Sequence, residues 1–372
     1  MPSEVVDLFT ELAALPSPPG EERAVADVVI GYLRDLGLTV DEDDAGSKVG
    51  SNIGNVYCRL EATDGGNPIF LCAHLDTVPP EGPIEPVIED GVVRNAAGTI
   101  LGADNKSAVA AMLEGTRRVL AENRPHGGIE LLFTPKEEVG LLGAATFDHE
   151  RLQARLGYVY DQAAPIGEVI LGAPYSRAMQ VRFHGRAAHS GMYPEEGRSA
   201  IAAAARAISD LRLGRIDEET TANVGIIQGG TAGNIIPEWC TLDAEARSHD
   251  ERKLDELVQE MVDVFSFAAG LEDCEVEAKG SKSYKGYRFK PDDPVVRIAH
   301  VALEQSGYKP TYGLSGGAAD ANVFNERGLT CLNLANGMQD IHTPDERITV
   351  ADLEGMVEVT LALVDAARDA DT

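Results

Sequence analysis

The stretch IELLFTPKEEVG, residues 129–140, places two adjacent glutamates, Glu137 and Glu138, directly after an apolar run typical of a buried strand. In open α/β sheets, functional side chains gather at the carboxyl ends of the strands. Two neighbouring carboxylates there repel each other, so the pair is easier to explain if one binds a metal ion and the other transfers a proton. The structural alternative is that they begin the helix predicted next, because acidic side chains stabilise a first helical turn.

Acidic and imidazole residues also follow apolar runs in four other stretches. These are His74 and Asp76 in FLCAHLD (70–76), Asp104 in LGADNKSA (101–108), Asp161 in VYDQ (159–162) and His342 in DIHTPDE (340–346). Each has an ordinary explanation by itself: a surface pair, a helix N-cap, a turn residue and a loop histidine. Together, mixed oxygen and nitrogen ligands favour Zn²⁺, with Co²⁺ or Mn²⁺ as substitutes. Two such ions about 3.5–4 Å apart would share a bridging carboxylate.

Composition argues against several classes of function. The chain has 372 residues and a formal net charge of -29, and binding to nucleic acid or an anionic membrane would require a basic face. The five cysteines are odd in number and form no CxxC motif, so neither a disulfide framework nor a cysteine-based zinc site is expected. The N-terminal stretch predicts an amphipathic helix rather than a signal peptide, and no apolar run reaches membrane-spanning length. We therefore expect a cytoplasmic protein.

The order of predicted elements indicates an α/β protein of two domains. Strands alternate with helices in residues 1–175 and again in 288–372, which predicts one sheet covered by helices on both faces. Residues 176–287 instead predict the order βαββαβ, as in ferredoxin-like α+β domains. The larger domain is therefore expected to be interrupted by a smaller inserted one.

Several motifs, in this order along the chain, resemble those of a known family. They are KVGSNIGNVY, HLDTVP, GADNKSA, PKEEVGLLGA, an aspartate after an apolar strand, GRAAHSG, GGTAGNIIP, SGGAADAN and IHTPDE. Together they span nearly the whole chain and resemble the di-zinc peptidases of the peptidase T, glutamate carboxypeptidase and acetylornithine deacetylase superfamily, with the peptidase T-like members closest. The resemblance implies a mixed-sheet zinc-exopeptidase catalytic domain, and it makes the inserted domain a lid or dimerisation domain.

The resemblance also implies roles for the residues of the metal site. Five residues would bind two Zn²⁺ ions per chain: His74, Asp104, Glu138, Asp161 and His342. Asp104 would bridge the ions, with His74 and Asp161 on one of them and the remaining two ligands on the other. Glu137 would be the general base that takes a proton from a metal-bridging water and passes it to the leaving amine. Asp76 would orient His74, its carboxylate accepting a hydrogen bond from the second ring nitrogen, and a cis peptide is expected between Asp104 and Asn105.

Substrate contacts are implied by the resemblance in both domains. His189 in GRAAHSG would stabilise the oxyanion of the tetrahedral intermediate, and Arg247 and Asn234 would hold the substrate's carboxylate or backbone. The turn at Gly316 and Gly317 would let the substrate backbone approach closely. In some relatives the lid histidine comes from a partner subunit, so the resemblance is compatible with a homodimer formed through the lid domain.

The predicted function is a metal-dependent exopeptidase that hydrolyses short peptides in the manner of a tripeptidase or aminopeptidase. Asp161 stands where some carboxypeptidases of the family have glutamate, and it favours an aminopeptidase or aminoacylase over a carboxypeptidase. The alternative is an amidohydrolase that deacylates N-acyl amino acids, or a carboxypeptidase, using the same site. A binding or scaffold protein on this fold would lack a ligand or the base, and the sequence contains all of them.

Overall fold

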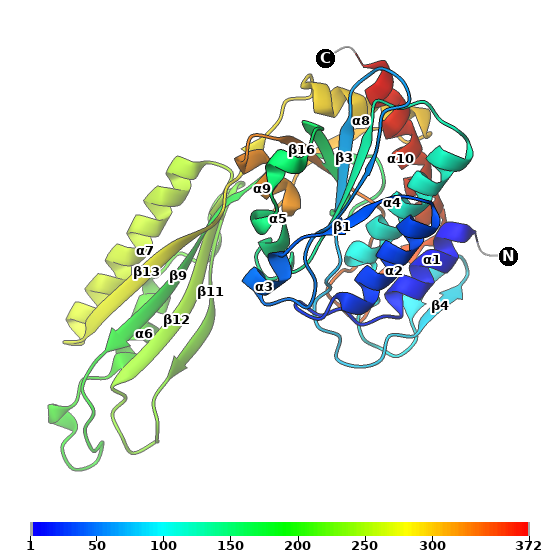
Figure 1. Ribbon diagram of the computed structural model, residues 1–372. Helices are drawn as coiled ribbons and strands as arrows, with labels where there is room; N and C mark the ends of the chain where they lie inside the picture. The colour runs from blue at the N-terminus through cyan, green and yellow to red at the C-terminus, as the bar shows by residue number, and fades with distance from the viewer. Residues whose placement is uncertain (1–2, 371–372) are drawn as a thin grey trace. The chain divides into compact units, whose positions relative to one another are not determined.

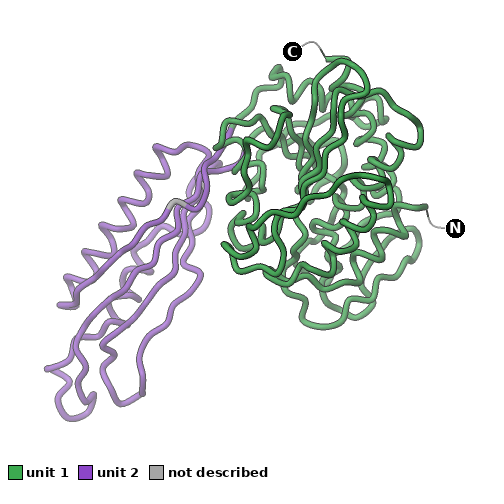
Figure 2. The backbone as a smooth tube through the Cα atoms, viewed as in Figure 1, with its two compact units in different colours: residues 1–172, 288–372 green, residues 173–287 purple. Residues whose placement is uncertain are grey.

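The computed structural model describes residues 3–370, which form two compact units (Figure 1, Figure 2). Unit 1 comprises the chain up to Gly172 and again from Arg288, and unit 2 comprises Ala173–Tyr287. The insertion thus begins slightly before the predicted residue 176, because the long strand β9 (Tyr175–His184) belongs wholly to unit 2. Its end coincides with the predicted boundary after residue 287.

A nine-stranded mixed sheet forms the centre of unit 1. Its strands are β1 (Val40–Glu42), β2 (Val56–Leu60), β3 (Ile69–His74), β6 (Ile129–Thr134), β7 (Leu156–Val159), β8 (Glu168–Ala173), β14 (Tyr287–Arg288), β15 (Thr311–Leu314) and β16 (Thr330–Leu334). The order is β1-β2-β6-β3-β7-β16-β8-β14, and β15 pairs with β8. The neighbours β6, β3, β7 and β16 run parallel, so their carboxyl ends meet at one edge. The predicted mixed α/β fold is confirmed.

Helices cover both faces of this sheet (Figure 1). They are α1 (Glu4–Ala13), α2 (Arg23–Asp35), α3 (Ala45–Val49), α4 (Ala103–Ala121), α5 (Leu142–Thr146), η1 (His149–Arg151), α8 (Pro294–Gln305), α9 (Asp320–Glu326) and α10 (Val350–Asp369). Strands β3 and β6 are buried along their whole length, as expected for strands covered on both faces. Among the described helices, none is long and apolar enough to cross a membrane.

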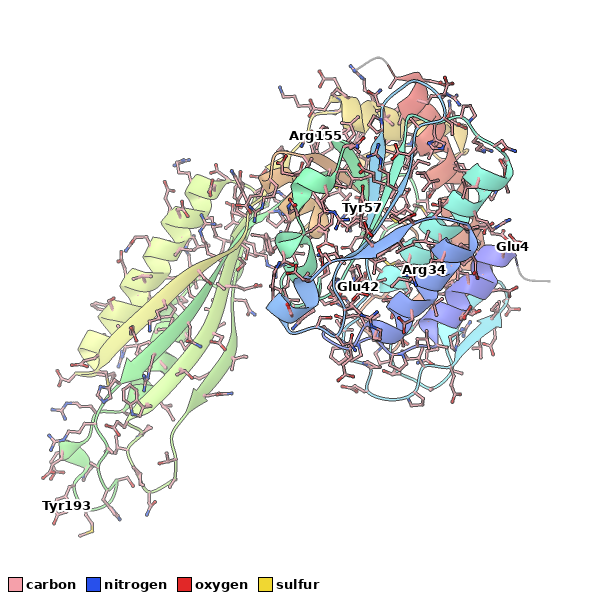
Figure 3. All side chains as sticks on the ribbon, viewed as in Figure 1. Glu4, Arg34, Glu42, Tyr57, Arg155 and Tyr193 are labelled. Carbon is pink, nitrogen blue, oxygen red and sulfur yellow. The ribbon has the colours of Figure 1, made fainter. Side chains whose placement is uncertain are left out.

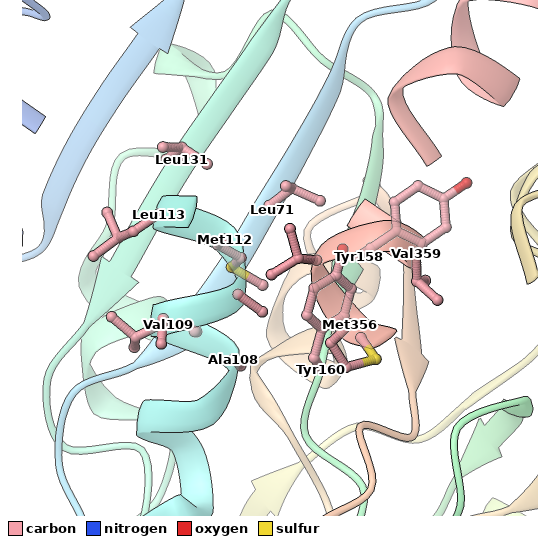
Figure 4. Close-up of a cluster of buried hydrophobic side chains, with 14 of the residues drawn as sticks. Leu71, Ala108, Val109, Met112, Leu113, Leu131, Tyr158, Tyr160, Met356 and Val359 are labelled. Carbon is pink, nitrogen blue, oxygen red and sulfur yellow. The ribbon is translucent and has the colours of Figure 1, made fainter. Parts of the chain in front are cut away.

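The core behind the sheet fixes the position of α4, the helix whose first turn carries Asp104. Met112 of α4 and Met356 of α10 lie among buried side chains such as Leu71 and Leu131 (Figure 4). The two helices can cross closely because residue 115 is glycine: a Cβ there would lie 2.7 Å from Cγ2 of Thr360. This close packing leaves α4 little freedom to slide along the sheet.

A small three-stranded sheet in unit 1 was not predicted from the sequence. It consists of β4 (Pro86–Glu89), β5 (Val92–Asn95) and β17 (Arg347–Thr349), in the order β17-β5-β4. Each strand has only three or four residues, and β4 has no buried position, so no periodic apolar pattern could be recognised. Because β17 directly follows the DIHTPDE stretch, this sheet anchors the loop that carries His342.

Unit 2 is an antiparallel sheet covered on one face by two helices. Its elements are β9 (Tyr175–His184), η2 (Pro194–Glu196), α6 (Ala200–Asp210), β10 (Gly214–Arg215), β11 (Thr220–Gly229), β12 (Trp239–Ser248), α7 (Glu251–Leu271) and β13 (Glu275–Tyr284). Apart from the two-residue β10, the strand order is β11-β12-β9-β13 and all ladders are antiparallel. This is the arrangement predicted from the βαββαβ order. Side chains such as Ala203, Leu257 and Phe265 form its separate apolar core.

Candidate metal centre

The predicted metal ligands come together at the carboxyl edge of the parallel strands. His74 is the last residue of β3, and Asp161 lies two residues after the end of β7. Glu138 follows β6, Asp104 lies in the first turn of α4, and His342 lies in the loop between β16 and β17. Residues that are up to 268 positions apart (342 minus 74) thus converge on one place.

Asp104 lies at the centre of this cluster, with one carboxylate oxygen toward each histidine. Its Oδ1 lies 3.2 Å from Nε2 of His74, and its Oδ2 lies 3.2 Å from Nε2 of His342. Oδ1 of Asp161 lies 3.9 Å from the His74 nitrogen, and Oε1 of Glu138 lies 2.9 Å from the His342 nitrogen. The donors therefore form two sets that share Asp104, which is the arrangement that a bridging carboxylate requires.

The backbone around Asp104 turns its side chain toward this edge. Gly102 has a left-handed conformation, with φ of 78°, and Asp104 and Asn105 depart from helical backbone angles. The peptide bond between Asp104 and Asn105 is cis, as the family resemblance implied. Regular helical geometry begins after these residues, so Asp104 is held by a turn rather than by a helical face.

The loop after β6 folds back on itself and so presents the glutamate pair. Pro135 follows the strand, and the amides of Gly140 and Leu141 donate to the carbonyl oxygen of Glu137 at 2.9 and 2.8 Å. The Gly143 amide donates to the Pro135 carbonyl at 3.0 Å, and a Cβ at Gly143 would lie only 2.4 Å from that oxygen. Glycine is therefore required for this close return of the chain.

Asp76 positions the site differently from the prediction. Nδ1 of His74 lies 2.8 Å from the backbone carbonyl oxygen of Asp76, whereas the nearest carboxylate oxygen is 3.6 Å away, too far for a hydrogen bond. The carboxylate instead accepts the backbone amides of Glu137 and Glu138, at 2.9 and 3.1 Å. The main chain of Asp76 thus orients the histidine, and its side chain holds the glutamate pair.

The electrostatics of the cluster fit a site for cations. Burial, together with the charge of Asp104, raises the pKa of Asp161 to about 7. Burial and the charge of Asp161 also raise the pKa of Glu137 well above its usual range. Hydrogen bonds to Asp104 and Glu138 raise the pKa of His342 to about 10. Protons therefore compensate the crowded carboxylates, and divalent cations would do the same more strongly.

The donor set also fits the chemistry of zinc. Ligand atoms of His74, Asp104 and Glu138 lie within 4.8 Å of one another, as do those of His74, Glu137 and Asp161. Imidazole nitrogen with carboxylate oxygen is a common zinc ligand combination. Glu137 thus lies close enough to His74 and Asp161 to reach the same metal position.

Within unit 2, the structure brings two predicted substrate contacts together and separates the third. The amide of Ser190 donates to the carbonyl oxygen of Asn234 at 3.0 Å, beside an isolated bridge between His189 and Ile235. In Figure 3, Tyr193 marks this loop at one end of the unit. Arg247 instead pairs with Ser176, eight register positions from the Trp239–His184 pair at the other end of the ladder. About 27 Å of sheet therefore separates the histidine loop from Arg247.

Gly316 and Gly317 lie in unit 1, between β15 and α9. The Gly317 amide donates to Oγ of Ser315 at 3.1 Å, which closes a tight turn. A Cβ at Gly316 would meet no atom within 4 Å, so nothing in the described chain itself requires glycine there. The predicted contact with substrate backbone stays a prediction.

Two buried carboxylates beside the cluster were not recognised from the sequence. Oδ2 of Asp320 accepts from Oγ1 of Thr134, the last residue of β6, at 2.5 Å. The carboxylate of Glu346 accepts three backbone amides in the turn that carries Asp104. Both lie within quoted motifs, SGGAADAN and IHTPDE, but neither has a local pattern that reveals its partner.

Comparison with known proteins identifies similar peptidases. Residues 172–271 match the family model of the M20 peptidase dimerisation domain, and residues 55–181 match that of peptidase family M28. The chain is 38% identical over 363 residues to the uncharacterised protein YqjE of Bacillus subtilis (strain 168), with 98% of each sequence covered. The solved structure of aminopeptidase PepT from Bacillus cereus ATCC 10987 is 39% identical, with a TM-score of 0.89 and 98% of both chains covered. That of a tripeptidase from Staphylococcus aureus subsp. aureus Mu50 is 34% identical, with a TM-score of 0.94, covering 99% of this chain and 98% of that one.

Replacement of Asp104 tests whether this residue is shared by both sets of metal donors. Asp104→Ala should lower the occupancy of both metal positions together, because each set loses the oxygen that faces its histidine. Elemental analysis of the purified variant, compared with wild type, measures this. Two metal ions per chain in the variant would contradict the bridging role.

Proposed function

The chain belongs to the peptidase T-like members of the M20 peptidases, and we propose that it is a metal-dependent exopeptidase that hydrolyses short peptides. The observation that carries this proposal is Asp104, whose two oxygens each face a histidine at 3.2 Å. The similar structures are those of an aminopeptidase and a tripeptidase, which favours tripeptides with a free amino terminus as substrates.

Zinc is the proposed metal, with two ions per chain and Co²⁺ or Mn²⁺ as substitutes. The ligands would be His74, Asp104, Glu138, Asp161 and His342. When bound, the ions would polarise the scissile carbonyl group and lower the pKa of water. The mixed oxygen and nitrogen donors support this choice over Mg²⁺ or Ca²⁺, which prefer oxygen ligands.

Glu137 is the proposed proton carrier. Its side chain is buried beside His74 and Asp161, and its backbone amide is held by the Asp76 carboxylate at 2.9 Å. Low exposure raises its pKa, which makes it a better base than an ordinary surface glutamate. Glu137 would take a proton from the attacking water and pass it to the amine that leaves, so that no proton needs to come from bulk solvent.

A substrate panel with and without metal tests the function. Wild type should release the N-terminal residue of tripeptides, lose this activity after treatment with a chelator, and regain it with added Zn²⁺. N-acetylated tripeptides should resist cleavage, because the free amino terminus is missing. Faster hydrolysis of N-acetyl amino acids than of any tripeptide would instead establish the deacylase, and release of C-terminal residues would establish a carboxypeptidase.

Replacement of Glu137 separates the base from a ligand. Glu137→Gln should keep two metal ions per chain and lower kcat by about 10²–10⁴-fold, the usual contribution of a general base. The neighbouring Glu138→Gln is the matched control, and it should lose metal because Glu138 lies in the His342 set. Loss of metal in Glu137→Gln, or normal turnover with full metal content, would contradict the assignment.

We also propose a homodimer through unit 2 in which His189 acts on the site of the partner chain. The match to a peptidase dimerisation domain supports the dimer. The separation of His189 and Arg247, about 27 Å along one sheet, supports a division of roles, because one copy of unit 2 cannot present both side chains to the same short peptide. With His189 assigned to the partner's site, Arg247 is assigned to the other role, in the site of its own chain.

Mixed dimers of two inactive variants test this division. Co-expression of Glu137→Gln with His189→Ala should restore about a quarter of wild-type activity, because half the dimers are mixed and each has one complete site. Glu137→Gln with Arg247→Ala, assayed below KM, is the control and should restore nothing. No recovery in isolated His189→Ala mixed dimers would place the histidine in its own chain's site.

A further inference from the structure

Glu346 is a buried carboxylate that takes no part in the proposed chemistry. It is 2% exposed and lies four residues after His342, just before β17. Its Oε2 accepts the backbone amides of Leu101 and Gly102, both at 2.8 Å, and its Oε1 accepts the amide of Asp104 at 3.0 Å. Three charge-assisted bonds to backbone from one side chain form a strong connection between segments far apart in sequence.

The turn that Glu346 holds is the turn that directs Asp104. Because Asp104 and Asn105 have non-helical backbone angles, the helical hydrogen-bond ladder does not fix the Asp104 side chain. The amides at the start of a helix have no acceptor within the helix. Glu346 supplies that acceptor, so the direction of the Asp104 carboxylate depends on where Glu346 lies.

The same residue anchors the loop that carries His342. Gln339 and Arg347 exchange backbone hydrogen bonds of 3.0 and 3.1 Å, which close the loop at its base. Between them, the side chain of His342 is 43% exposed and residues 342–345 lie at the surface. Glu346 is the buried end of this exposed segment, and it joins the histidine loop directly to the Asp104 turn.

We propose that Glu346 is a positioning residue that sets Asp104 against His342 and so couples the filling of the two metal positions. This inference rests on the proposed metal-dependent function, and it adds a residue that touches neither the metal nor the substrate. If Glu346 shifts, the oxygen facing His342 and the oxygen facing His74 move together, because both belong to Asp104. Metal affinity at both positions should therefore fall together.

Metal affinity of Glu346 variants tests the proposal. Glu346→Gln keeps the shape but replaces one acceptor oxygen by an NH₂ group that faces a backbone amide. Competition with a chromophoric chelator should show Zn²⁺ affinity lowered by about 10–100-fold at both positions, the usual effect of such supporting partners. Glu346→Asp, which keeps the charge on a shorter side chain, should lie between this variant and wild type, and it serves as the test if the glutamine variant does not fold.

Glu130→Gln is the matched control for a general loss of stability. Glu130 is likewise a buried carboxylate, 1% exposed, that accepts the backbone amides of Gln153 and Ala154 and the hydroxyl of Tyr57. None of these partners belongs to the metal cluster, so the control should lower the Tm of the metal-free protein without changing Zn²⁺ affinity.

The outcomes separate the inference from the proposed function. If folded Glu346 variants bind Zn²⁺ at both positions as tightly as wild type, the inference is overturned. It is also overturned if Glu130→Gln, with the same Tm as the Glu346 variant, loses as much Zn²⁺ affinity. A loss of Zn²⁺ affinity at only one of the two positions would overturn the proposed coupling. A wild-type protein that binds no divalent cation would overturn the proposed function, and the inference with it.

Discussion

Repulsion among buried carboxylates is the constraint on which the arrangement of unit 1 depends. Five carboxylates share the carboxyl edge of the sheet with two imidazoles: Asp76, Asp104 and Glu137 are buried, and Glu138 and Asp161 are half-buried. Holding such groups together requires fixed donors and cations, since each charge is costly to remove from water. The protein supplies backbone amides to Asp76 and protonatable nitrogens to Asp104. The close crossing of α4 and α10 keeps the turn that bears Asp104 at this edge.

Part of the candidate site could be predicted from the sequence because His74 and Asp161 follow apolar runs and Asp104 lies at the start of a helix. Those runs are buried strands, and the rule that sites form at their carboxyl ends placed His74 and Asp161 together. The partner of the Asp76 carboxylate could not be predicted in this way. Its choice between a ring nitrogen at 3.6 Å and an amide at 2.9 Å depends on sub-ångström geometry.

The parts that escaped prediction depend on contacts between distant residues or on very short elements. Glu346 reaches an amide 242 positions earlier, and no local spacing records such a pair. Strands β4, β5 and β17 are too short for a periodic signal, and they owe their existence to pairing with one another. In unit 2, periodicity predicted the strands, but the opposite placement of His189 and Arg247 appears only in the ladder register.

The order in which the ligands occur along the chain has a consequence for synthesis in the cell. His342 and Glu346 come from the last 31 residues of the 372, after the whole of unit 2 has been made. A growing polypeptide therefore carries the first four proposed ligands without the histidine that completes the second set. The second proposed donor set therefore cannot form before His342 has been synthesised, so the order of residues along the chain delays assembly of the proposed metal site.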